Sequence, residues 1–139
     1  MLIAPIVNQV ATVAALKRVS GSASFAAAQV DTIVTPCAYV LPLADTANPN
    51  RMLSGAVEQR VSERFGVVLA ITNARDARGA RANDDLEAIR AAVITALLGW
   101  QPASGYDPVE YGGGRMLALT NYILWWQLEF ATAYFERKV

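Results

Sequence analysis

The chain has 139 residues, the size of one domain, and 54% of them are apolar, which is enough to bury a substantial core. Twelve basic residues balance twelve acidic ones, which excludes a strong overall attraction to nucleic acid or to an anionic membrane. Histidine is absent, and with it the commonest general base and metal ligand, while the single cysteine excludes an internal disulfide. No apolar run approaches the ~20 residues that cross a bilayer. We therefore expect one domain over residues 1–139 that is soluble and made in a cytoplasm.

The N-terminal third of the chain predicts a helix followed by a short strand. Apolar residues spaced by three and four predict a helix over Met1–Val19. Pro36 and Pro42 bound a strand over Cys37–Leu43 and indicate an edge or terminal place in a sheet. The composition of Asp45–Asn50 predicts a loop, the best candidate for a mobile segment that becomes ordered only against a neighbour.

The segment Val57–Ile71 has the period-two pattern of a strand. Its odd positions are mostly apolar, and its even positions change from polar before Gly66 to apolar after it. This change indicates that one half is exposed on one face, while the other half is covered on both faces. A continuous strand of this length reaches ~50 Å at ~3.3 Å per residue, more than the usual strand. The strand therefore either bends near Gly66 or projects as a polar arm, which needs a partner to pair with.

The C-terminal half predicts one more helix, a hairpin and a long strand. An apolar stripe predicts a helix over Ala82–Leu98, with Gly99 as its stop. Val109–Leu119 has the pattern of a hairpin that turns at the three glycines Gly112–Gly114. Alternating large apolar residues predict a strand over Tyr122–Phe135. The order of elements predicts an α+β fold, an antiparallel sheet with two main helices packed on one face, long strands and an extended loop or arm.

The sequence offers few residues for chemistry. Cys37 lies in a strand-like context and is expected to be a small buried hydrophobe. The acidic cluster of Asp84, Asp85 and Glu87 begins a helix, where acidic residues favour the helix dipole, so it does not indicate a metal site. Gly112–Gly114 lacks the pattern of a phosphate-binding loop, and no histidine is present to activate a nucleophile. We expect no catalytic, cofactor-binding or metal-binding residues.

Arginine is concentrated in one stretch of the chain. Six of the ten arginines lie there, and three acidic residues oppose them, which leaves a charge of +3. The six are Arg51, Arg60, Arg64, Arg75, Arg78 and Arg81. Three interpretations remain open. The stretch is a solvated face with local ion pairs, an intersubunit or partner surface, or a nucleic-acid contact, against which the lack of interleaved aromatic residues argues. Our candidate interface residues are Arg51, Arg60, Arg64, Arg75 and Arg78.

Trp125 and Trp126 point to opposite faces of the predicted C-terminal strand. One layer of helices can bury only one of them, so the other needs cover from a loop or from another subunit. Both belong to the core in one interpretation. In the other, one of them forms exposed aromatic surface at an assembly contact, and both are therefore candidate interface residues.

Six segments in order along the chain resemble the phage tail-terminator proteins of long-tailed phages and of proteobacterial prophages. They are Ala38–Leu43, Glu58–Leu69, Asn73–Gly79, Leu98–Pro102, Glu110–Arg115 and Leu124–Phe130. The set is specific because the segments run in one order over nearly the whole chain.

The resemblance implies a structural virion protein with an α+β sandwich fold and no catalytic residue. Such proteins form a hexameric ring that caps the head-proximal end of the tail tube and ends tube polymerisation. The implied partners are further copies of the chain, the major tail tube protein and a head-completion or connector protein. DNA passes through the lumen without sequence reading, and no membrane or cofactor is involved.

Two other functions are weighed against this one. Another neck, head–tail joining or tail-completion protein has a similar size and composition and also forms rings. A small ligand-binding domain or enzyme that uses the tryptophan-rich strand as a pocket is a different class, and the absence of histidine argues against the enzyme.

Overall fold

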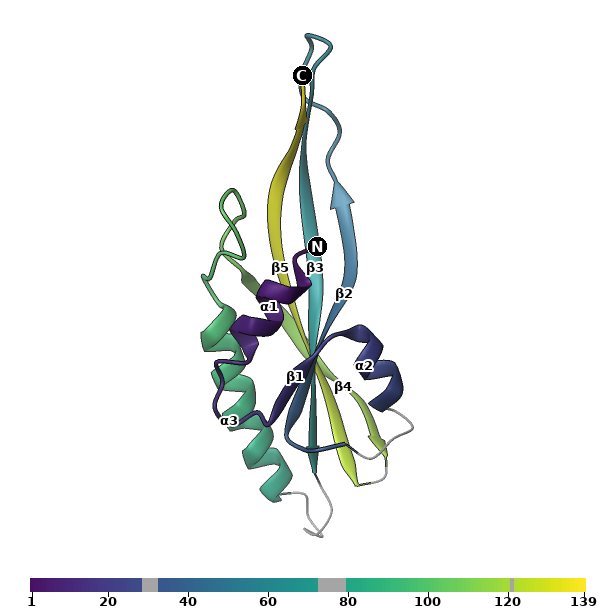
Figure 1. The fold of residues 1–139 in the computed structure, drawn as a ribbon, viewed down its shortest axis with the longest axis vertical. Coiled ribbons are helices and arrows are strands. Elements are labelled where there is room, and N and C mark those ends of the chain that lie inside the picture. The colour runs from purple at the N-terminus through teal and green to yellow at the C-terminus, as the bar shows by residue number, and fades with distance from the viewer. Residues whose placement is uncertain (29–32, 73–79, 121) are drawn as a thin grey trace.

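The computed structural model describes residues 1–28, 33–72, 80–120 and 122–139. Within them the chain forms three helices and five strands (Figure 1). In chain order these are α1 (Ile3–Val10), β1 (Arg18–Ser20), α2 (Ser22–Ala28), β2 (Cys37–Ala47), β3 (Val57–Thr72), α3 (Ala80–Leu97), β4 (Glu110–Thr120) and β5 (Ile123–Lys138). The predicted α+β class is confirmed, as are the long strands and the helix that begins near Ala82.

The strands form a single sheet in the order β1-β2-β3-β5-β4. β1 runs parallel to β2, and every other neighbouring pair is antiparallel. The two longest strands, β3 and β5, pair over their whole length, from Val57 opposite Lys138 to Thr72 opposite Ile123. This pair is the axis of the molecule. The helices, β1 and β4 lie around its lower half, and β2 runs beside it into the upper half (Figure 1).

Helices α1 and α3 pack on one face of the sheet, as predicted. Their buried residues are Ile6, Val10, Ile89, Val93 and Leu97. They cover the odd-numbered side chains of β3 and their neighbours on β5, where the rings of Phe65 and Phe130 stack with centroids 5.6 Å apart. Each large apolar side chain buried here contributes roughly 1.5–3 kcal/mol, so this layer is the main core of the protein.

Helix α2 covers the opposite face. Phe25 from this helix meets the edge of the Trp125 ring at 5.9 Å, and Tyr39 of β2 lies against both rings. Cys37 is buried beside them, as predicted, with its thiol 3.6 Å from the Tyr39 hydroxyl. The seven residues of α2 thus supply the cover for the second face.

The first helix is shorter than predicted, and its predicted end at Val19 is wrong. After Val10 the chain continues in tight turns, in which the N–H of Val13 bonds to the carbonyl of Val10 at 3.0 Å. Val13 is buried and Leu16 half-buried, so the helical spacing of apolar residues continues in turns that are not helix. The last residues of the predicted helix form β1 instead, because the parallel ladder with β2 satisfies their backbone groups.

Strand β2 is longer than predicted. The predicted loop Asp45–Asn50 is wrong at its start, because Asp45, Thr46 and Ala47 continue β2 and pair with β3. The register shifts between Pro42 and Ala44, so a bulge carries the strand past the proline. β1 pairs with β2 only as far as Tyr39, so Pro42 lies where β2 has one neighbour, in agreement with the predicted edge position.

The predicted hairpin around the three glycines is also wrong. Residues 110–120 form one strand, β4, whose register against β5 shifts between Tyr111 and Gly113. A Cβ on Gly114 would lie 2.7 Å from Nε1 of Trp126, so glycine is required here by close approach of the indole. The glycines therefore serve a bulge and a packing contact within a strand. The turn of the hairpin falls instead between β4 and β5, next to Tyr122.

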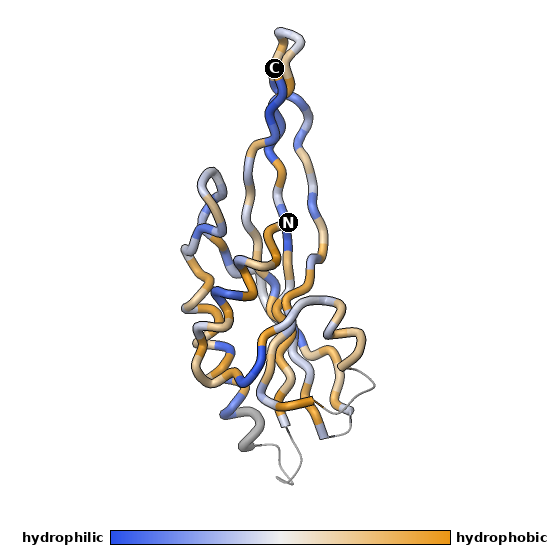
Figure 2. The backbone as a smooth tube through the Cα atoms, in the orientation of Figure 1, coloured by the Kyte–Doolittle hydropathy of each residue, from blue (hydrophilic) through white to orange (hydrophobic). Residues whose placement is uncertain are grey.

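The polar half of β3 projects from the body. This is one of the two predicted alternatives; the other was a bend near Gly66. We call the projecting part the arm and define it as residues 44–64 and 131–139, which continue β2, β3 and β5 beyond the helices (Figure 1). Figure 2 shows hydrophilic residues gathered in the arm and hydrophobic ones in the lower sheet. The expected pairing partner is the chain itself, because β3 pairs with β5 along the whole arm and with β2 from Val61 to Arg64.

Candidate assembly interface

One face of the arm carries a cationic cluster around Phe135. The guanidinium carbons of Arg51, Arg137 and Arg60 lie 4.9, 5.2 and 5.7 Å from the centre of this ring. Glu58 accepts hydrogen bonds from Nε of Arg51 at 2.7 Å and from Nε of Arg137 at 2.8 Å. The hydrogen bond from Arg51, with the charge of Arg137, lowers the pKa of Glu58. Together these contacts hold three mobile side chains in fixed positions on one aromatic surface.

Arg60 and one further arginine, Arg64, pair with acidic residues from other elements. Arg60 pairs with Asp107 in the segment before β4, and Arg64 pairs with Glu129 of β5 at 3.0 Å. The side chains of Arg51 and Arg64 stay 63% and 58% exposed, so these surface pairs add little to stability. The sequence did not reveal these partners, because the charge balance compared the arginines only with acidic residues in the same stretch of the chain.

Arg75 and Arg78 lie outside the described residues. Their predicted place at an interface stays a prediction, as does that of Arg51, Arg60 and Arg64. The structure brings Arg51 and Arg60 together over the Phe135 ring, whereas Arg64 lies farther along the arm, paired with Glu129.

The opposite face of the arm contains a buried carboxylate. The Glu63 side chain is 3% exposed, its Oε1 lies 3.8 Å from the Met1 amino group, and its Oε2 has no hydrogen-bond partner among the described residues. Burial, with the nearby charge of Asp45, raises its pKa. Sequence analysis did not single out Glu63, although its odd-numbered position between Val61 and Phe65 puts it on the apolar face.

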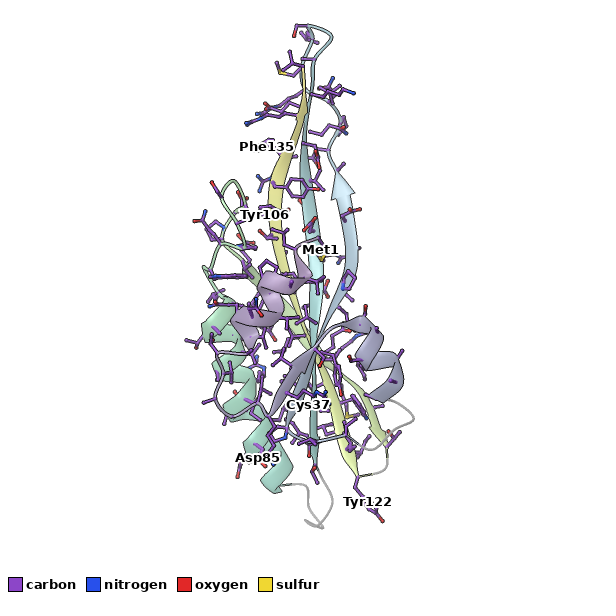
Figure 3. All side chains as sticks on the ribbon, viewed as in Figure 1. Met1, Cys37, Asp85, Tyr106, Tyr122 and Phe135 are labelled. Carbon is purple, nitrogen blue, oxygen red and sulfur yellow. The ribbon has the colours of Figure 1, made fainter. Side chains whose placement is uncertain are left out.

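The segment between α3 and β4 braces this face of the arm (Figure 3). Tyr106 stacks on Tyr134 with ring centroids 4.9 Å apart. The N–H of Asp107 donates to the carbonyl of Ala133 at 2.8 Å, and the Thr132 hydroxyl donates to the carbonyl of Asp107 at 2.7 Å. Burial raises the pKa of Tyr134 to about 12, so its phenol stays neutral. These bonds attach the root of the arm to the body.

The tip of the arm is an ordered loop with an apolar apex. Oδ1 of Asn50 accepts hydrogen bonds from the N–H groups of Met52 and Glu58, and its Nδ2 donates to the carbonyl of Ala56. Leu53 is fully exposed beside Met52. A leucine held at the apex of a hydrogen-bonded loop gains nothing from the fold itself, which is typical of a contact residue.

The family model described as "Phage tail terminator protein" matches residues 2–138, nearly the whole chain. The chain belongs to this family. The resemblance noted in the sequence is thus confirmed, and family membership supports a structural role in a phage tail.

The fold of this tail-terminator family member also occurs in a solved structure. A chain of the "Virion of native gene transfer agent (GTA) particle" has a TM-score of 0.56 and 16% sequence identity, over 97% of this chain and 95% of that one. At this identity the likeness shows a shared fold. No curated protein matches the chain by sequence.

In this family member the two tryptophans lie on opposite faces of β5, as predicted. Trp125 is buried under α2 of its own chain, which supplies the cover that the sequence left to a loop or another subunit. Trp126 packs half-buried at the rim of the main core, and its Nε1 is buried with no hydrogen-bond partner in the described part of the chain.

Two further features concern other classes of function. Among the described residues, no three cysteine, aspartate or glutamate side chains gather where they could hold a metal ion. Over the same ranges, no helix combines the length and the apolar character that crossing a membrane requires.

Proposed function

We propose that this chain is a subunit of the ring that caps the head-proximal end of the phage tail tube and ends its polymerisation. The observation that carries the proposal is the match of the terminator family model to residues 2–138. The likeness of the fold to a chain from a virion structure supports a place in a particle.

The form of the molecule supports this role. A cap has to complement the open end of a tube and hold its own subunits together. The arm offers a long, self-paired scaffold with an exposed apolar tip, and pre-ordered segments lose little entropy on contact. Arg51, Arg60 and Arg64 lie on this arm with exposed guanidinium groups, and we assign them to contacts with neighbouring subunits or partners.

The ring is proposed to be a hexamer, built from heterologous contacts that close by rotation. Its partners are the major tail tube protein on one side and a head-completion or connector protein on the other. DNA crosses the lumen without sequence reading, in accord with the even balance of charge. The role is structural and uses no cofactor or catalytic residue.

Deletion of the gene from a producing phage or prophage tests the proposal. The expected result is intact capsids with overlong or unjoined tails, restored to normal length when the wild-type chain is supplied from a plasmid. Tails of normal length in the deletion strain would contradict the terminator role. Normal-length tails that fail to join capsids would point to a head–tail joining protein.

A further inference from the structure

The outer edge of β4 is apolar and unpaired. β4 is the last strand of the sheet, so its outer backbone groups bond to no strand of the described residues. Met116 and Leu119 are 55% and 53% exposed there, and Leu117 is exposed beside them. A long apolar edge strand is a template for pairing with another chain, and stable proteins cover or protect such edges.

A second open edge lies on the other side of the sheet. β1 pairs with β2 only from Cys37 to Tyr39, so the outer edge of β2 is open from Val40 onward. Figure 1 shows no element on the outer side of the upper half of β2, away from β3. Leu43, the residue that the β2 bulge leaves out of register, is exposed on this strand.

The two edges are complementary in direction. Three antiparallel steps separate β2 from β4, through β3 and β5, so β2 and β4 run in opposite directions. Two copies that point the same way, as neighbours in a ring do, would therefore present β4 of one and β2 of the next as an antiparallel pair.

Side-chain faces and bulges select the register. Ala118 and Leu41 both pack against the Trp125 side of the sheet, so they are suited to lie opposite one another. This pairing places Leu119 opposite Val40 on the other face and Arg115 opposite Ala44. The register shift of β4 between Met116 and Ala118 then falls against that of β2 between Pro42 and Ala44. Pro42 has no N–H to donate, so the ladder is interrupted where the two bulges face each other and continues on both sides of them. The four pairs that follow Arg115, from Met116 to Leu119, are apolar.

The stagger of this register suits a closed ring. Within one copy, the cross-strand pairs run from Arg115 to Gln127, then to Val68 and then to Tyr39. The proposed partner Ala44 pairs instead with Arg64 of its own β3. The offset from Val68 to Arg64 is about 13 Å at ~3.3 Å per residue, and the four strands from β2 to β4 span about 19 Å at ~4.8 Å each. The ratio corresponds to a strand tilt of about 35°, within the ~35–45° at which sheets close into barrels.

We propose that the outer edge of β4, from Arg115 to Leu119, pairs antiparallel with the outer edge of β2, from Val40 to Ala44, of a second copy of this chain. The inference rests on the proposed ring and names the contact that builds it. It also accounts for the shortness of β1, which leaves the upper part of β2 free.

A cysteine pair tests the register directly. Arg115→Cys and Ala44→Cys change two residues outside the core, and the native Cys37 is 1% exposed and stays protected. Mild oxidation of tails that contain the double variant should give a disulfide ladder in multiples of 14.9 kDa, while each single variant should give none. Arg115→Cys with Leu98→Cys, in the residue that follows α3, is the control pair and should also give none. Absence of a ladder from the first pair in assembled tails, or an equal ladder from a single variant, would overturn the proposal.

A matched pair of lysine variants separates this contact from the function. Leu119 and Leu98 are almost equally exposed, at 53% and 55%, so Leu119→Lys and Leu98→Lys should leave the melting temperature unchanged. Only Leu119→Lys should reproduce the overlong tails of the deletion strain. Normal tails with Leu119→Lys would overturn the edge pairing and leave the terminator role standing, whereas normal tails in the deletion strain would overturn that role. If Leu119→Lys lowers the melting temperature, its effect on tail length no longer isolates the contact. The disulfide ladder of the cysteine pair then tests the edge pairing.

Discussion

Replacement of Gly114 by alanine should destabilise the protein through a single atom. The added Cβ would lie 2.7 Å from Nε1 of Trp126, 3.1 Å from the Tyr111 hydroxyl and 3.2 Å from the carbonyl oxygen of Gln127. The backbone oxygen cannot retreat without breaking the pairing of β4 with β5, so the indole has to move out of its place at the rim of the core. Overpacking of this kind costs about 1–3 kcal/mol. At roughly 4 °C per kcal/mol for a domain of this size, the melting temperature should fall by about 4–12 °C.

Calorimetry or thermal circular dichroism measures this loss, with Gly21→Ala as the matched control. Gly21 has no atom within 4 Å of an added Cβ and no positive φ, so alanine there should be neutral or stabilise by less than about 1 kcal/mol. Tryptophan fluorescence should change only in Gly114→Ala. Equal stability of the two variants would refute the argument that the β4 glycines serve a packed strand.

Four further variants test the core, the arm and its tip. Burial raises the pKa of Glu63, so its protonated carboxyl stabilises the fold at acid pH, and this contribution to stability is lost as pH rises. Glu63→Gln resembles the protonated form and should therefore raise the melting temperature near neutral pH. The difference from the wild type should disappear toward about pH 4. Arg51 lowers the pKa of Glu58, so Glu58→Gln should lower the melting temperature near neutral pH, and this loss should disappear at acid pH. Melting temperatures measured over a series of pH values compare the two variants. Phe25→Ala should cost about 2 kcal/mol and shift the emission of Trp125 to the red. Leu53→Asp should stay within ~0.5 kcal/mol of wild type in stability yet fail to restore tail length, and a normal tail would show that the tip makes no contact.

The sequence predicted the features that depend on regular side-chain periodicity. The alternation of apolar and polar residues from Val57 onward predicted β3, and the apolar stripe over Leu86–Leu97 predicted α3. Both patterns run for many residues on a buried face. The face of each tryptophan followed from the same period of two. The prediction failed where a pattern was short or ambiguous. Val13 and Leu16 keep helical spacing in turns, and three glycines read equally well as a turn or as a bulge against Trp126.

The candidate interface was only partly accessible from the sequence. A concentration of arginine was visible, but the carboxylates that meet Arg60 and Arg64 come from residues 107 and 129, which only the fold brings close. The buried Glu63 was marked by its place in the period of two and was still passed over, because its neighbours in the chain are polar. Pro36 and Pro42 indicated an edge position for β2, but the open edge of β4 could not be predicted, since strand order in a sheet depends on long-range pairing.

The location of the chain in an assembled particle tests the central claim most directly. Cryo-electron microscopy of tails from the producing phage, with this structure fitted to the density, should show a closed ring of copies at the head-proximal end of the tube. Density for the chain at the distal end of the tail, inside the capsid, or as single copies outside any ring would contradict the account.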